Sequence, residues 1–105
     1  MKKVVLDIDT SDRTKSVVSL TVGNKTEKLV VETPLGSGTA VLSSIETILG
    51  KHGLKLTDIT DFRVATGPGS YTGLRVGAAI VNTFGWLLRV PVNGNAARTP
   101  VVPEY

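Results

Sequence analysis

The sequence predicts an α/β fold: a five-stranded mixed sheet, with three antiparallel strands followed by two parallel ones, and two main helices. Residues 3–33 hold three short segments in which apolar and polar residues alternate, which is typical of strands with one buried face. Two longer segments then place apolar residues at helical spacing, and a short strand pattern follows each of them. A strand, a helix and another strand in succession indicate parallel strands joined by right-handed crossovers.

The first three strands are expected to form an antiparallel meander. Residues 3–9 and 17–22 alternate, and one face of each is apolar: Val4, Leu6 and Ile8, then Val18, Leu20 and Val22. Gly23-Asn24 is a hairpin signal, and a third strand is predicted over 26–33.

The first helix is predicted after a break in the sheet pattern at Pro34 and Gly36. Apolar residues recur there at helical spacing and form the expected buried stripe: Val41, Leu42, Ile45, Ile48 and Leu49. Gly53 is well placed to end this helix in a left-handed conformation. His52 beside it is the only histidine, and we interpret it as a helix-end residue that complements the helix dipole.

The second half of the chain predicts a fourth strand near 62–66, a second helix over 72–88 and a fifth strand over 90–93. Residues 1–93 are therefore interpreted as one domain, because about a hundred residues suffice for a single core. Residues 94–105 are interpreted as an irregular tail that contains prolines.

The second helix has no charged residue between Arg75 and Arg89. A helix that is apolar all round is expected to be buried on all sides, and a small sheet covers only one side. We expect a partner protein to cover the rest, while the alternative is that the first helix does so. The residues assigned to this interface are Gly77, Ile80, Val81, Phe84, Trp86 and Leu88.

Composition excludes several classes of function. The chain has no cysteine, which excludes disulfides, thiol nucleophiles and thiolate metal sites. The net charge of +3 is spread over scattered lysines and arginines, unlike the basic runs of arms that bind nucleic acid. No stretch is long enough for a membrane span or a signal peptide, so a cytoplasmic location is expected.

A glycine-rich turn joins the fourth strand to the second helix. Gly67 and Gly69 permit backbone angles that side chains forbid, and Pro68 fixes φ between them. Ser70 or Thr72 is expected to cap the helix. The resulting elbow, with N–H groups pointing outward, is suited to an anion or a partner's carbonyl, and the alternative is a purely structural turn. The loop residues concerned are Gly67, Pro68, Gly69, Ser70, Tyr71, Thr72, Gly73 and Arg75.

Two carboxylates, Asp7 and Asp9, share one face of the first strand, and Thr10 and Ser11 follow them. Such a pair is suited to a magnesium ion held through water. The alternative, which we favour, is structural: Asp7 accepts hydrogen bonds from backbone amides near the glycine elbow, and Asp9 ends the strand. No metal site of the protein's own is predicted.

The run from Gly67 to Gly77, GPGSYTGLRVG, closely resembles the signature of the TsaB (YeaZ) family, bacterial proteins needed for threonylcarbamoyladenosine formation in tRNA. The opening strand, ending in Asp9-Thr10-Ser11, and the phrase over 54–59 are similar as well. The resemblance covers residues 3–93. It implies the N-terminal one of two actin/Hsp70-like (ribonuclease H-like) lobes.

The resemblance also implies a function. The chain would be a non-catalytic scaffold, not an enzyme, in the assembly that modifies the adenosine next to the anticodon. Its partners would be TsaD-like and TsaE-like proteins or, in isolation, a second copy, with tRNA reached only indirectly and ATP and magnesium only through the partner complex. The turn formed by Asp7, Asp9, Thr10 and Ser11 would be the vestige of a nucleotide site.

Three alternatives stay open. The first is a small nucleotide-binding or ATPase domain that uses Asp7, Thr10 and the glycine elbow. The second is a stand-alone homodimeric binding module with an unrelated role. The third is an inactive remnant.

Overall fold

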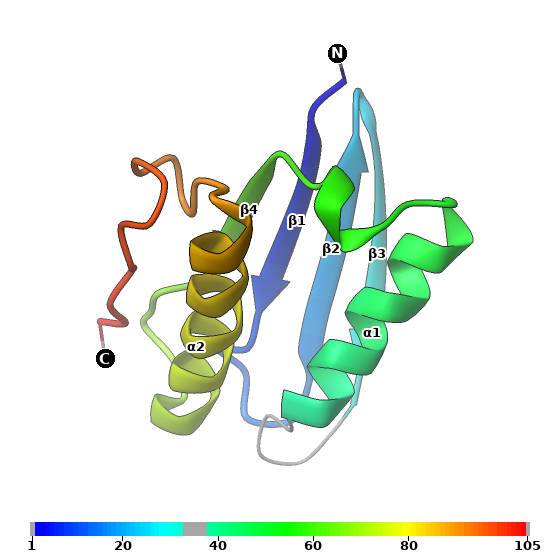
Figure 1. Cartoon of the computed structure of the whole chain (residues 1–105). Helices are drawn as coiled ribbons and strands as arrows, with labels where there is room; N and C mark the ends of the chain where they lie inside the picture. Colours follow the sequence, from blue (N-terminus) through cyan, green and yellow to red (C-terminus); the bar gives the residue numbers. More distant parts are fainter. Residues whose placement is uncertain (1, 33–37, 105) are drawn as a thin grey trace.

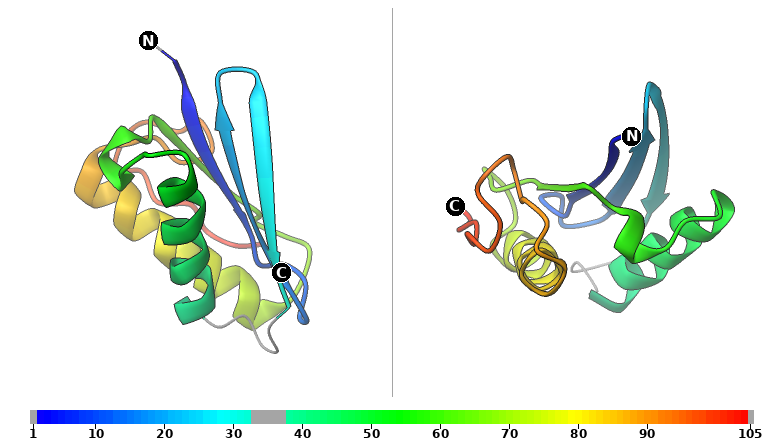
Figure 2. Two further views of the ribbon diagram at one scale, coloured as in Figure 1. Left: turned by 90° about the vertical axis from the view of Figure 1, so that its right-hand side faces the viewer. Right: turned by 45° about the horizontal axis from the view of Figure 1, so that its top comes forward.

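The computed structural model describes residues 2–32 and 38–104. Within these ranges a mixed sheet has the strand order β3-β2-β1-β4, and β1 pairs antiparallel with β2 and parallel with β4. Both main helices lie side by side on one face of this sheet (Figures 1 and 2). The elements are β1 (Val4–Asp9), β2 (Ser16–Val22), β3 (Lys25–Val31), α1 (Gly38–Lys51), the 3-10 helix η1 (Leu56–Asp58), β4 (Asp61–Val64) and α2 (Tyr71–Leu88).

The predicted α/β class and the antiparallel meander are confirmed. Leu6 pairs with Leu20 across β1 and β2, and both side chains are buried beneath the helices. The hairpin turn has Gly23 at φ +64°, a value that glycine adopts without strain. Strand β3 ends at Val31, whereas the expected continuation to Thr33 and the break at Pro34 and Gly36 lie outside the described residues.

The core lies between the sheet and the two helices. Residues at alternate strand positions meet residues from the inner stripes of both helices, and Phe62 of β4 stacks on Phe84 of α2 with the ring centroids 6.2 Å apart. The buried members are Val4, Leu6, Ile8, Val18, Leu20, Val41, Ile45, Ile48, Leu49, Ile59, Phe62, Val64, Ala78, Val81, Val92 and Val101. One contiguous core therefore serves the domain and reaches into the tail.

The prediction of a fifth strand over 90–93 is wrong for this structure, which has four strands in its described part. Val92 forms only an isolated parallel bridge with Phe62. Pro91 has no N–H to donate, and Asn93 turns the backbone away at φ +53°. The Asn93 side chain accepts the backbone N–H of Val64 at 2.9 Å and donates to its C=O at 3.1 Å. The amide side chain therefore bonds the β4 backbone groups that a fifth strand would have paired with.

Helix α1 has the predicted apolar stripe, with one of its five residues as an exception. Gly53 is left-handed at φ +65°, as expected for a residue that ends a helix. Leu42, placed by the sequence pattern on the buried stripe, is instead 45% exposed. The buried stripe is narrower than the sequence pattern suggested. Val41, Ile45 and Ile48 are buried in the core, whereas Leu42 follows Val41 by about 100° around the helix axis and therefore lies beside the stripe.

The segment 94–104 has neither helix nor strand; residues 94–100 are exposed, and the later residues are bonded to the domain. The Asn82 side chain of α2 bonds both the N–H and the C=O of Val101 at 2.9 Å. Further on, the Glu104 N–H donates to the Thr66 carbonyl at 2.6 Å. The tail therefore runs back along α2 to the start of the elbow (Figure 1). None of the helices in residues 2–32 and 38–104 is long and apolar enough to cross a membrane.

Candidate functional site

The glycine elbow connects β4 to α2 and is joined to the carboxyl end of β1. Ser70 caps α2, because its Oγ accepts the N–H of Gly73 at 3.2 Å. Two backbone bonds join the elbow to the end of β1: Ala65 N–H donates to the Ile8 carbonyl at 3.0 Å, and Ser70 N–H donates to the Ser11 carbonyl at 2.8 Å. Ser70 is therefore the cap that the sequence offered as one of two candidates.

Thr10 forms the centre of this junction and is fully buried. Its hydroxyl donates to the carbonyl of Gly73 at 2.5 Å. A Cβ at Gly73 would collide with the Thr10 carbonyl oxygen, and a Cβ at Gly77 with the Thr10 hydroxyl. The two glycines let the helix backbone lie directly on Thr10, so Gly77 belongs to the inner face of α2 and not to the outer surface assigned from the sequence.

The two elbow glycines serve different purposes. Gly67 has φ +131°, in the region that favours glycine. Gly69 does not have a positive φ; instead its Cβ position lies 2.7 Å from the Ser11 carbonyl oxygen. The expectation that Gly69 is needed for its backbone angle is therefore wrong, and the physical reason for glycine there is the close approach of Ser11.

The aspartates lie on the other side of the strand from Thr10. Asp9 Oδ1 accepts both the N–H and the hydroxyl of Ser11, at 2.9 and 2.5 Å. Asp7 is half-buried, and its expected bond to amides of the elbow is absent from the described structure. Burial first and the nearby Asp9 second raise the pKa of the Asp7 carboxyl, while Arg63 and Lys28 oppose the shift. Alternation along β1 thus separates Thr10 from the carboxylates.

No group of three histidine, cysteine, aspartate or glutamate side chains comes close enough to hold a metal ion within the described ranges. His52 instead bonds Glu27 of β3, with Nε2 and Oε1 2.9 Å apart, and Lys51 reaches the same carboxylate at 2.7 Å. The hydrogen bonds from Lys51 first and His52 second lower the pKa of Glu27. This contact between α1 and β3 was not found from the sequence, because the residues are far apart along the chain.

The outer surface of α2 begins with the exposed part of the elbow. Tyr71 is 56% exposed, and Arg75 donates to its hydroxyl at 2.9 Å while lying over its ring. Thr72 beside them is exposed as well, as are Gly67, Pro68 and Gly69 at the tip of the turn. The elbow therefore offers solvent an aromatic ring and a guanidinium.

The apolar residues of α2 divide into two groups. Val81 is fully buried in the core, which corrects its assignment to the outer interface, and Ile80, Phe84 and Leu88 are half-buried against that core. Trp86 is 54% exposed, but Arg98 of the tail lies 5.1 Å from its ring centroid. Leu87, which the sequence analysis did not single out, is 67% exposed.

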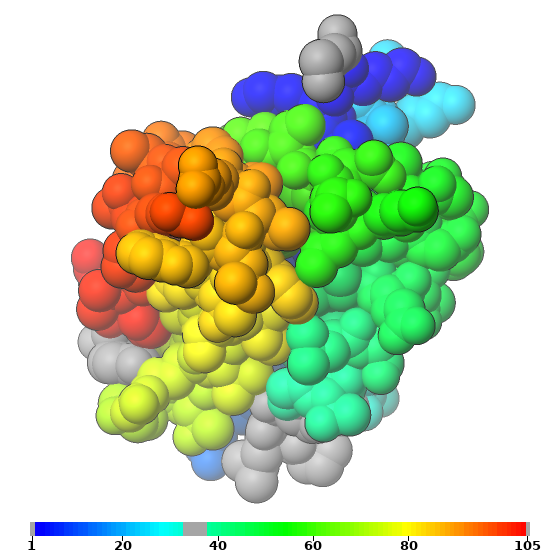
Figure 3. Space-filling view, viewed as in Figure 1, coloured from blue at the N-terminus to red at the C-terminus, as the bar shows by residue number. Residues whose placement is uncertain are grey.

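A hollow of about 460 Å³ lies between α1, η1 and the carboxyl end of α2. Leu42 of α1 and Phe84 of α2 face it from opposite sides, and Leu49, Leu54 and Leu56 contribute to its lining. The crease between α1 and α2 runs along one face of the molecule (Figure 3). We name the exposed apolar surface of the two helices around this hollow, which includes Leu42 and Leu87, the helix-pair surface.

Comparison with known proteins gives consistent results. Residues 38–94 match the family model described as "TsaD: tRNA N6-adenosine threonylcarbamoyltransferase". The chain is 27% identical over 89 residues to the tRNA threonylcarbamoyladenosine biosynthesis protein TsaB of Bacillus subtilis, which covers 85% of the chain and 39% of that protein. It is 36% identical over 89 residues to the TsaB of Haemophilus influenzae, covering 84% of the chain and 37% of that protein.

Among solved structures, YeaZ from Pseudomonas aeruginosa superposes with a TM-score of 0.80 at 23% identity, over 86% of the chain and 42% of YeaZ. This likeness supports the mixed sheet with two helices as the shared fold. The chain spans about two-fifths of the length of the curated relatives that it matches.

The fold and the site define the class of this domain. It is an α/β domain with two helices on one face of a mixed sheet, and the elbow between β4 and α2 is hydrogen-bonded to the end of β1. The matched family model covers both helices, β4 and the elbow, more than half of the chain. The chain belongs to this family and, within it, to the TsaB (YeaZ) proteins.

Proposed function

We propose that the protein is a non-catalytic scaffold subunit in the threonylcarbamoyladenosine modification of tRNA, and that its helix-pair surface binds a TsaD-like catalytic protein. In the absence of that partner, a second copy occupies the same surface. A TsaE-like protein also joins the assembly. The chain contacts tRNA only indirectly, through this assembly. The domain then acts as one actin-like lobe in the cytoplasm, and ATP and magnesium belong to the partner complex.

The observation that carries the proposal is the helix-pair surface itself. Leu42 and Leu87 are large apolar side chains, 45% and 67% exposed, on neighbouring helices. Leu42 lines the hollow, and Leu87 follows Phe84, which also lines it, by about one turn of α2. Burying a leucine side chain completely contributes about 1.5–3 kcal/mol, so covering this surface stabilises an assembly. Isolated exposed apolar residues are common on proteins, but a set grouped across two helices is typical of an interaction site.

The chemistry of the junction supports a structural role for the former nucleotide turn. The Thr10 hydroxyl, which a phosphate-binding turn would present to its ligand, is buried and donates to the Gly73 carbonyl. Asp9 is engaged by Ser11. These groups hold α2 on β1, and the alternative of an ATPase domain that uses Thr10 requires this junction to open.

The proposal is tested by mixing the purified chain with a purified TsaD-like protein and measuring the dissociation constant by calorimetry. Leu87→Glu and Leu42→Glu each place an unpaired charge in the contact, and we expect each to weaken binding by more than about tenfold. Val30→Glu is the matched control, because Val30 is 53% exposed on β3 and alternates away from the helix side. Since all three positions are exposed, we expect the thermal midpoints to stay close to that of the parent.

Light scattering on the chain alone measures the competing self-association, which the same two variants should abolish. Two results would contradict the scaffold role: no binding of the TsaD-like protein together with a monomer at high micromolar concentration, or equal binding by all three variants. ATP hydrolysis by the isolated chain, lost in Asp7→Asn, would contradict the non-catalytic assignment alone.

A further inference from the structure

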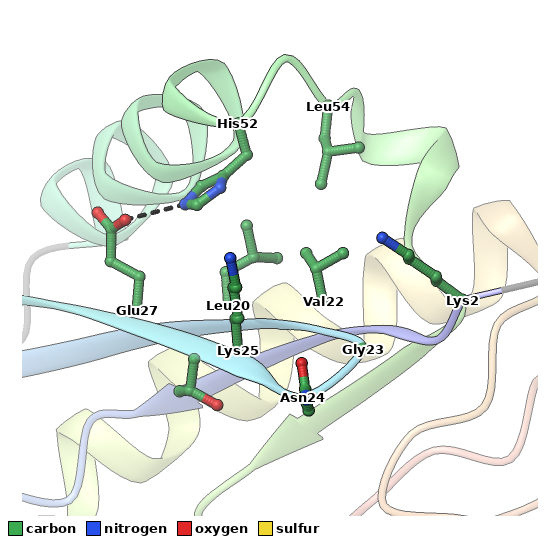
Figure 4. Close-up of a pocket in the computed structure, with 10 residues that line it drawn as sticks. Lys2, Leu20, Val22, Gly23, Asn24, Lys25, Glu27, His52 and Leu54 are labelled. Carbon is green, nitrogen blue, oxygen red and sulfur yellow. Dashed lines mark hydrogen bonds and ion pairs between the residues drawn. The ribbon is translucent and has the colours of Figure 1, made fainter.

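A second cavity, of about 450 Å³, lies at the other end of the sheet from the glycine elbow. It is enclosed by the β2–β3 hairpin, the carboxyl end of α1 and the loop that follows that helix (Figure 4). Its volume falls within the range of about 300–1,000 Å³ that is usual for small-molecule sites. The cavity adjoins the hollow of the helix-pair surface, because Leu54 lines both, but its other lining residues are different.

The floor of this cavity is apolar. Leu20 and Val22 of β2 face it from the sheet, and Leu54 faces it from the loop after α1 (Figure 4). Val22 and Leu54 are only partly buried by the rest of the chain. An apolar ring placed here would cover surface that the fold leaves accessible, which is favourable in proportion to the area removed from water.

The rim of the cavity is cationic. Register places Lys25 beside Val22 on the helix side of the sheet, and alternation places Lys2 on the same side as Val4. The two side chains reach toward the space above Val22 (Figure 4). Within residues 2–32 and 38–104, neither ammonium group forms an ion pair.

Among the described residues, one acidic side chain lines the cavity, that of Glu27, and its charge is already paired. Glu27 bonds His52 at 2.9 Å and Lys51 at 2.7 Å. The Glu27 carboxylate is therefore paired with residues at the end of α1 and not with Lys2 or Lys25. Apolar walls with a few convergent charged groups are the usual make-up of a site for an organic ligand.

From this combination we propose that the cavity binds a small organic anion: an apolar ring system, lying on Leu20, Val22 and Leu54, that carries one carboxylate, sulfonate or phosphate held by Lys2 and Lys25. The ring supplies the buried area and the anion supplies the charge that the lysines match. The anion contact is separate from the scaffold role, since neither lysine belongs to the helix-pair surface.

The test uses two fluorescent probes that share one apolar body: anilinonaphthalene sulfonate, which carries an anion, and N-phenylnaphthylamine, which does not. We expect the sulfonate to bind the full chain saturably and the neutral probe to bind about tenfold more weakly. Amide shifts in NMR spectra with the sulfonate should concentrate at Gly23, Asn24 and Thr26, which line this cavity and not the hollow between the helices.

Two variants and a control locate the binding. Lys2→Glu/Lys25→Glu should weaken binding of the sulfonate roughly tenfold, because two charge contacts are lost, and Val22→Trp should fill the cavity and compete with the ring. Lys3→Glu/Lys15→Glu makes the same change in net charge at residues that do not line the cavity, and it should bind like the parent.

Three outcomes would overturn the proposal. The first is no saturable binding of the sulfonate, and the second is equal affinity for both probes. The third is binding that the Lys2/Lys25 variant retains, with amide shifts gathered on the helix-pair surface instead.

Discussion

The two faces of strand β1 carry different parts of the protein's chemistry. On the side under the helices lie Leu6 and Ile8, followed by Thr10, all fully buried. On the opposite side lie Val5, Asp7 and Asp9, which are half-buried or exposed. The sequence Asp9-Thr10-Ser11 is continuous, yet the pleat sends its carboxylate and its central hydroxyl to opposite faces.

This difference shows how one motif serves two environments. Thr10 lies directly against the α2 backbone at Gly73 and Gly77 and donates a hydrogen bond to the Gly73 carbonyl. Asp7 faces charged neighbours across the sheet, with Arg63 beside it on β4 and Lys28 one strand beyond Ser19. We therefore expect substitutions on the helix side to change packing and those on the open side to change only electrostatics.

The largest effect is expected at Gly73. In Gly73→Ala the new Cβ collides with the Thr10 carbonyl oxygen, and since backbone on both sides must shift, we expect a loss of about 3 kcal/mol in the free energy of unfolding. Chemical denaturation measures it. The control is Gly50→Ala in α1, where nothing lies within 4 Å, which should stabilise the protein by about 0.5–1 kcal/mol. Equal midpoints for the two variants would show that the helix does not rest on Thr10.

A smaller effect is expected for Thr10→Val. Valine keeps the shape but removes the hydroxyl that donates to the Gly73 carbonyl, and losing one buried hydrogen bond costs about 0.5–1.5 kcal/mol. Thr47→Val on the exposed side of α1 is the control, expected within about 0.5 kcal/mol of the parent. If both variants unfold at the same denaturant concentration, the buried hydrogen bond does not stabilise the junction.

The smallest effect is expected on the open face, at Asp7. Because burial and Asp9 raise its pKa above 3.8 in the folded protein, the folded state holds this proton more tightly than the unfolded state. The contribution of Asp7 to stability is therefore most favourable below pH 3.8 and falls as the pH rises through the raised pKa. Asp7→Asn should be more stable than the parent at pH 7, and this advantage should shrink in acid.

Thermal midpoints measured from pH 3 to pH 7 check this expectation, with Asp12→Asn as the comparison of opposite sign. Hydrogen bonds from Thr14 lower the pKa of Asp12, so its ionised form favours the folded state, and the variant should lose stability at pH 7. A stabilisation of Asp7→Asn that does not depend on pH would mean that packing, and not charge, governs the open face.

Much of the candidate site was predictable because it depends on neighbours along the chain. The Ser70 cap, the turn at Gly23 and the left-handed Gly53 each follow from bonds or angles within a few residues. The elbow signature also carried the family resemblance. The fate of Thr10 was not predictable, because its partner Gly73 is 63 positions away, and only the folded arrangement brings the two together.

By itself the sequence determined the order of strands and helices, their inward faces and the family, because alternation, helical spacing and a glycine motif are local patterns. The tertiary structure alone decided that Asn93 replaces a fifth strand, that Asn82 anchors the tail at Val101, and that Glu27 joins α1 to β3. It also decided which α2 residues face outward: Leu87 does, and Val81 does not. Each of these depends on distant segments meeting, and a side chain finds such a partner only when the whole chain has folded.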